Sequence, residues 1–139
     1  MRRLARSDPQ LHWATHFPDA CPPEGAHLRS TTVYVFVRTD PPTPLDFRSQ
    51  VERGRFEPRA ADEPGKFCQA CGLSVSDTLA DARKLCDVIP FFRKLKIAEG
   101  HPKPGLVLAT GGPTPGHLTW WIPKGARPWD SFNVLKEGA

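Results

Sequence analysis

The segment Thr31–Arg38, which reads Thr-Thr-Val-Tyr-Val-Phe-Val-Arg, decides the fold of this chain. Its residues are β-branched or aromatic at nearly every position, and both alternating sets of side chains are apolar. Such a strand is typical of the middle of a sheet that is covered on both sides. Asp40 and the two prolines after it end the strand. We therefore expect the other elements to pack around a central strand.

A first helix is predicted directly after this strand. Thr43 is a capping residue, Pro44 suits the first helical position, and Asp46 completes a capping box. The helix is expected to include Val51 and to end at Gly54, because glycine favours the position after a helix. Residues 55–67 are polar and predict a long loop.

A second helix is predicted from Leu79 to about Val88. Thr78 and Asp81 form a second capping box at its start, and Pro90 ends it. One apolar face is expected at helical spacing. Its members are Leu79, Ala82, Cys86 and Ile89, with Leu85 also at or near the core.

Short apolar segments separated by turn residues predict the remaining strands. They are expected at residues 72–76, 94–98, 106–110, 117–122 and 132–135. The fold class is therefore α+β, with a single mixed, mainly antiparallel sheet and two helices packed on it. We place this domain at residues 31–139. Residues 1–30 form a segment rich in proline, histidine and arginine, with Trp13 and Phe17 as its expected anchors.

Composition narrows the class of protein without deciding its function. The chain has 139 residues, 39% of them hydrophobic, which suits one domain with one core. Its net charge of +4 permits an acidic partner but does not require one. No apolar run approaches the roughly 18 residues of a membrane helix, and no secretory signal is recognised. We expect a soluble cytoplasmic protein, with no membrane partner and reduced cysteines.

Three segments carry a resemblance. They are Asp46-Phe47, Gly72-Leu73-Ser74-Val75 and Pro115-Gly116-His117-Leu118-Thr119-Trp120. Over roughly residues 31–122 the chain resembles a group of small uncharacterised bacterial proteins with an Asp-Phe, a Gly-Leu-Ser-Val and a Pro-Gly-His-x-Thr-x-Trp segment. This resemblance implies a fold and a choice of residues, not a reaction.

The order of elements is also faintly similar to small ADP-ribosyltransferase-like folds. In those folds an arginine or histidine ends the first strand, and a Gly-x-Ser-like strand precedes a helix. Arg38 and Ser74 hold these places here. The catalytic glutamate of such folds has no counterpart, because Glu99 and Glu137 are poorly placed for it.

Cys68 and Cys71 have the spacing of a zinc knuckle. A structural zinc site needs four ligands, and no second knuckle exists, so Cys21 and His16 would complete it, with His12 as a substitute. The metal would clamp the N-terminal segment to the loop before Cys68. Free thiols, and a redox or disulfide role for the pair, are the alternatives. Cys86 is expected in the core.

A ligand pocket is predicted around His117. Strand alternation places His117, Thr119 and Trp121 on one side of their strand, directly after the turn-rich segment 111–116. We expect Arg38 to hold an anion or carbonyl, Ser74 and Thr119 to donate hydrogen bonds, His117 to orient or exchange a proton, and Trp121 to cover a planar group. The alternatives are a structural His117, and an Arg38 that pairs with Asp40 or Asp46.

Three functions follow from these residues. The first is a binding or accessory module for a small molecule or a protein. The second is a small enzyme that uses a nucleotide such as NAD, which a glutamate near His117 would favour. The third is a nucleic-acid binder acting through a basic loop. Clustering of Arg48, Arg53, Arg55 and Arg59 with Lys94 and Lys96 would favour it.

Overall fold

Strand β1 is an inner strand of a six-stranded sheet in the computed structural model, which describes residues 11–56 and 65–136. The strand order is β4-β5-β2-β1-β3-β6, and every pairing is antiparallel. The strands are β1 (Val33–Val37), β2 (Leu73–Ser76), β3 (Lys96–Gly100), β4 (Leu106–Ala109), β5 (His117–Trp121) and β6 (Asn133–Val134). The predicted α+β class is confirmed.

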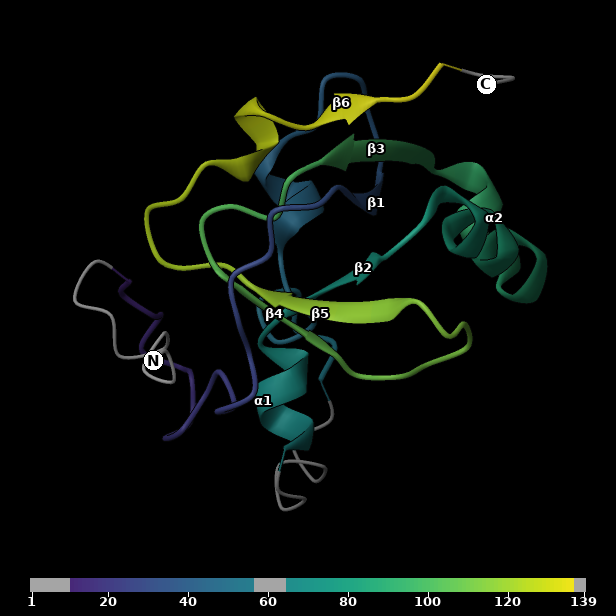
Figure 1. Cartoon of the computed structure of the whole chain (residues 1–139). Coiled ribbons are helices and arrows are strands. Elements are labelled where there is room, and N and C mark those ends of the chain that lie inside the picture. The colour runs from purple at the N-terminus through teal and green to yellow at the C-terminus, as the bar shows by residue number, and fades with distance from the viewer. Residues whose placement is uncertain (1–10, 57–64, 137–139) are drawn as a thin grey trace.

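Among the described residues, two α-helices and three short 3-10 helices accompany the sheet. They are α1 (Lys66–Ala70), α2 (Leu79–Val88), η2 (Pro44–Phe47), η4 (Pro90–Lys94) and η5 (Pro128–Asp130). In Figure 1 α1 lies beside β4 and β5, whereas α2 lies at the far end of β2. Across the described residues, none of the helices combines the length and apolarity that a bilayer crossing requires.

The main core covers one side of the sheet, which we call the first face. Val33, Val35 and Val37 of β1 point into it and are at most 2% exposed. Aromatic rings fill the space above them, since Trp120 stacks on Phe132 with ring centroids 5.7 Å apart. Large aromatic side chains contribute most of the apolar area that such a core removes from water.

The other side of the sheet, the second face, is covered in two places. Near α2, Phe36 stacks on Phe92 of η4 with ring centroids 4.3 Å apart. Near α1, Trp121 and Leu106 pack in a separate cluster with cysteines and the N-terminal segment. Apolar residues on both faces of β1 therefore meet cover on both faces, as its sequence predicted.

The first predicted helix is wrong in length. η2 has only four residues, and the backbone of Arg48 is extended, which ends the helix. A new turn begins at Ser49, where the backbone N–H of Ser49 donates to Glu52 Oε1 and the backbone N–H of Glu52 donates to Ser49 Oγ. Such reciprocal bonds start a turn afresh and compete with continuation of the helix. The short helix α1 was missed because its start fell in the predicted loop.

The second predicted helix is confirmed in its bounds, Leu79–Val88. Thr78 Oγ1 accepts a hydrogen bond from the backbone N–H of Asp81, as a capping residue does. Ala82 and Leu85 are buried against the sheet, and Cys86 is half-buried.

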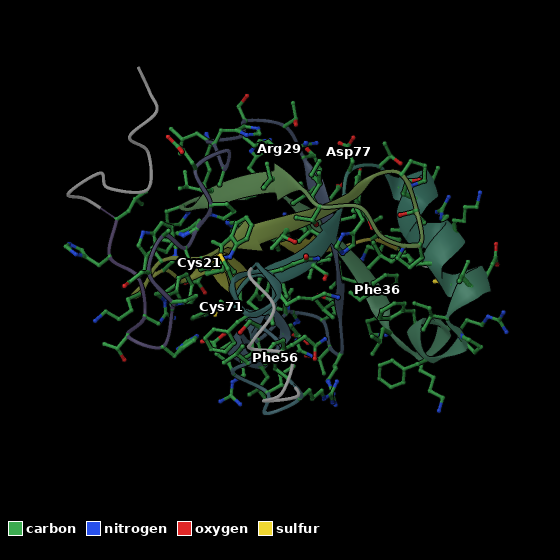
Figure 2. The ribbon with its side chains drawn as sticks, turned by 90° about the horizontal axis from the view of Figure 1, so that it is seen from below. Cys21, Arg29, Phe36, Phe56, Cys71 and Asp77 are labelled. Carbon is green, nitrogen blue, oxygen red and sulfur yellow. A yellow bond between two sulfur atoms is a disulfide. The ribbon has the colours of Figure 1, made fainter. Side chains whose placement is uncertain are left out.

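The described part of the N-terminal segment packs along strand β4. His27 and Val107 exchange two backbone hydrogen bonds, which cover part of the outer edge of β4. The rings of Trp13 and Phe17 stack on one another and pack against the second-face cluster. Arg29 forms an ion pair with Asp77 at the β2–α2 turn (Figure 2). Residues 11–30 thus share contacts with the domain predicted to begin at residue 31.

The burial of Leu85 generates a stability prediction. Leu85→Ala should lower the free energy of unfolding by about 2–5 kcal/mol, because it removes a buried side chain and leaves a cavity. Val88→Ala is the matched control, since Val88 is 53% exposed on the same helix, and should change it by less than about 0.5 kcal/mol. Urea unfolding of both variants measures the difference, and equal losses would contradict the assignment of the buried face.

Candidate functional site

A cavity of about 260 Å³ lies on the second face, between the segment 48–55 and the α2–η4 region. Arg38, Ser74 and His117, three of the five predicted ligand-binding residues, line it together. We call it the Arg38 cavity. Tyr34 and Phe36 of β1 contribute aromatic surface to its wall.

Strand register explains why residues far apart in the sequence meet here. Tyr34 pairs with Ser76, and Ser76 pairs with His117. Directly paired residues of antiparallel strands project from the same face of a sheet. Ser74, two residues before Ser76, therefore projects from this face as well.

Four arginines surround the cavity against a single carboxylate among its described lining residues. The arginines are Arg38, Arg48, Arg53 and Arg55, and the carboxylate is Asp46. The guanidinium of Arg53 is held in place by backbone carbonyls, since it donates to Arg48 at 2.9 Å and to Leu45 and Asp46 at 3.3 Å. Carbonyl acceptors fix its position without neutralising its charge. Arg59, predicted to join this group, lies outside the described residues.

The positive charge of this cluster perturbs Arg53 itself. Burial lowers the pKa of Arg53, and repulsion from Arg55, Arg38 and Arg48 lowers it further, while the attraction of Asp46 raises it. An arginine keeps its proton at neutral pH even so. The cluster therefore presents an uncompensated positive field, which an anion would relieve.

The carboxylate of Asp46 forms its hydrogen bonds with the backbone. Its carboxylate accepts hydrogen bonds of 2.9 Å from the backbone N–H groups of Arg38 and Thr43, and its side chain is buried. Asp46 thus bonds to the main-chain N–H of Arg38, which is a different contact from the side-chain ion pair considered from the sequence. Arg38 itself is an exposed residue that lines the cavity.

His117 is half-buried at the cavity wall. Its Nδ1 lies 3.1 Å from Thr110 Oγ1. Burial lowers the pKa of His117 below its ordinary value, opposed by a hydrogen bond with the backbone of Gly111. The imidazole is therefore neutral at neutral pH and can accept or donate a hydrogen bond.

Thr119 and Trp121 do not line the Arg38 cavity. Thr119 is buried, and its hydroxyl lies 2.8 Å from that of Thr110. Trp121 is 1% exposed, and its indole N–H donates to the carbonyl of Cys68 at 2.8 Å. The strand alternation placed both on the correct face, but α1 and the N-terminal segment cover that end of it.

Two glycines of the segment 111–116 allow close packing. A Cβ on Gly116 would clash with the Asp81 carboxylate, and one on Gly112 would come within 2.9 Å of the His117 ring. The backbone of this turn therefore approaches α2 and His117 too closely for a larger residue.

The predicted zinc site is replaced by a disulfide. Cys21 and Cys68 are bonded to each other, so neither is a thiolate ligand here and the expected reduced state is wrong for this pair. Cys71 is a buried free thiol beside them, and His16 packs edge-on against Phe17 with its Nε2 unbonded. Within residues 11–56 and 65–136 no three metal-ligating side chains gather. The clamp between segments exists, but it is covalent (Figure 2).

The sequence reasoning missed the aromatic part of the cavity. Phe91 and Phe92 of η4 also line it. The two adjacent phenylalanines after Pro90 indicate an apolar surface in the sequence. The 3-10 turn that folds them back over β1 is not evident from the sequence.

Comparison with known protein families, with curated proteins and with solved structures finds no match to this chain. The function must therefore be argued from the chemistry of the site.

The disulfide predicts a thiol count. Unfolded without reductant, the protein should show two reactive thiols, Cys71 and Cys86, and reduction should raise the count to four. Because the bond closes a loop between residues 47 apart, reduction should lower stability by about 2–5 kcal/mol. Ellman titration and thermal unfolding measure both. Four thiols without reductant, with a melting temperature that a chelator lowers, would restore the zinc site instead.

His117 predicts a pH dependence. Its folded pKa lies below that of the unfolded chain, so the unfolded state binds more protons near pH ~6.5 and stability falls as the pH drops through that region. His117→Asn should lose less stability than the wild type between about pH 7.5 and pH 5. His101→Asn, at an exposed histidine, is the control and should follow the wild type. Urea unfolding at both pH values decides; an unchanged slope in His117→Asn contradicts this role.

Proposed function

We propose that this domain is a binding module whose Arg38 cavity takes an anionic group, preferably a phosphate. The observation that carries the proposal is the gathering of four arginines against one carboxylate that the backbone already occupies. Guanidinium groups match the geometry of phosphate oxygens and bind them in pairs of hydrogen bonds. An anion in this cavity would relieve the mutual repulsion of the arginines.

The remaining lining suits the rest of such a ligand. Ser49, Ser74 and Ser76 place hydroxyl groups along the cavity, and His117 adds a neutral imidazole. Tyr34 and Phe36 supply ring surface for a planar group. A few convergent polar groups beside apolar walls are the usual composition of a small-molecule site.

Binding is better supported than catalysis with NAD. A glutamate near His117 would favour the enzyme, and the described lining of the cavity contains none. Asp46 is buried and already accepts two backbone hydrogen bonds, which leaves it poorly suited to act as a base.

A cytoplasmic location of the protein remains a prediction made from the sequence. The disulfide between Cys21 and Cys68 speaks against it, because disulfides persist mainly in oxidising compartments. The thiol count of protein isolated without reductant bears on this point directly.

Calorimetry with inorganic pyrophosphate at low ionic strength tests the proposal. Arg38→Ala should weaken binding about tenfold or more, because it removes a charged hydrogen-bond donor from the cavity. Lys103→Ala, which removes the same charge from an exposed position outside the cavity, should leave the affinity nearly unchanged.

His117→Ala separates a ligand-facing role from a structural one. A ligand-facing His117 predicts weaker pyrophosphate binding with a nearly unchanged melting temperature. A structural His117 predicts a loss of about 1–3 kcal/mol of stability with normal binding once folded. Failure of pyrophosphate to bind the wild type, or equal effects of Arg38→Ala and Lys103→Ala, would refute the anion site.

A further inference from the structure

A second, larger cavity adjoins the Arg38 cavity. Its volume is about 590 Å³, and it lies among α2, η4, β3 and the residues that follow β6. We call it the Lys96 cavity. Phe92 and Leu95 line both cavities and therefore form the ridge between them. The linings of the two cavities together extend from β2 across β1 to β3, and we call them the joint surface.

Positive charge concentrates on this joint surface. The described lining of the Lys96 cavity adds four basic residues and one acidic residue. The basic residues are Arg83, Arg93, Lys96 and Lys136, and the acidic residue is Asp40. Of the 15 basic and 10 acidic residues in the ranges 11–56 and 65–136, the two cavities hold eight basic and two acidic residues, which leaves seven basic and eight acidic elsewhere in these ranges. Within the part of the chain that the structure describes, the positive excess is therefore gathered at these two cavities.

Aromatic rings accompany the charge. Phe91 is 48% exposed at the Arg38 cavity, an unusual degree of exposure for so large an apolar ring. Phe92, on the ridge, is held by its stack on Phe36. The exposed ring of Phe91 lies beside the fixed ring of Phe92, and arginines surround both. Successive planar groups of a polymeric ligand can stack on such rings.

We propose that the joint surface binds single-stranded nucleic acid, with phosphates in the two cavities and bases against Phe91 and the ridge. The proposal rests on the proposed function, because the Arg38 cavity supplies one of the two phosphate sites. Phosphate contacts would supply most of the affinity and ring stacking the rest, so the binding would depend little on sequence.

The shape favours a single strand over a duplex. Base readout in a duplex requires an element that projects into a groove, whereas the basic residues here line recesses. A flexible strand can bend into both cavities and over the ridge. Arginine supplies six of the eight basic residues, which favours phosphates and bases over the carboxylates of an acidic peptide, because guanidinium stacks on planar rings as well as pairing with anions.

Fluorescence anisotropy with labelled oligothymidylate and oligouridylate of about 12 nucleotides tests the proposal. Lys96→Ala should weaken oligonucleotide binding several-fold and make it less salt-dependent, because one phosphate contact is lost. It should leave pyrophosphate binding in the Arg38 cavity unchanged. Lys84→Ala is the charge-matched control, because Lys84 is exposed and lines neither cavity.

A second variant tests stacking independently of charge. Phe91→Ala should weaken oligonucleotide binding about fivefold or more, because it removes an exposed stacking ring and no charge. Leu28→Ala is its control, because Leu28 is 69% exposed and outside both cavities. Circular dichroism of each variant verifies that it is folded.

The outcomes separate the two proposals. Suppose that pyrophosphate binding needs Arg38. The nucleic-acid proposal is then overturned, and the anion site kept, if no oligonucleotide binds or if Lys96→Ala and Phe91→Ala have no effect on its binding. Oligonucleotide binding that needs Lys96 and Phe91 but not Arg38 overturns the two-cavity path, while pyrophosphate binding alone decides the anion site. Equal affinity for a duplex, or equally effective competition by poly-glutamate, overturns the choice of a single strand.

Discussion

The packing of other elements against both faces of β1 is the constraint on which the rest of this structure depends. Valines on the first face require an aromatic core above them, and Phe36 on the second face requires the ring of Phe92. At its edges, β1 pairs with β3 from Val33 to Val37 and with β2 at Tyr34. The place where this cover is incomplete, between the segment 48–55 and the α2–η4 region, is the Arg38 cavity. The candidate site is thus a gap in the covering of the central strand.

Local signals in the sequence predicted much of this fold. The two apolar faces of β1 and the capping box of α2 act within a few residues, and their elements lie where they were expected. The helix after Thr43 failed because Asp46 uses its carboxylate to tie the end of β1, and because Ser49 and Glu52 start a new turn. Both effects depend on chain geometry that periodicity does not contain.

The sequence predicted the parts of the candidate site that depend on side-chain alternation along the strands. Ser74 and His117 share a face because β2 and β5 pair, and alternation alone predicted the side on which His117 projects. Trp121 shares that face, yet α1 and the N-terminal segment bury it, which no strand pattern can reveal. The pairing of Cys21 with Cys68 joins segments 47 residues apart, and spacing rules address only neighbours such as Cys68 and Cys71.

The disulfide also turns one stretch of this chain into a ring. Residues 21 to 68 are closed covalently, and the ring contains β1, η2 and the arginines of the segment 48–55. A single break of the backbone within the ring would leave one covalently connected molecule, with the strand and the sheet contacts on either side of the break still joined. The central strand and much of the basic wall therefore belong to a part of the protein that one proteolytic cut cannot release until the disulfide is reduced.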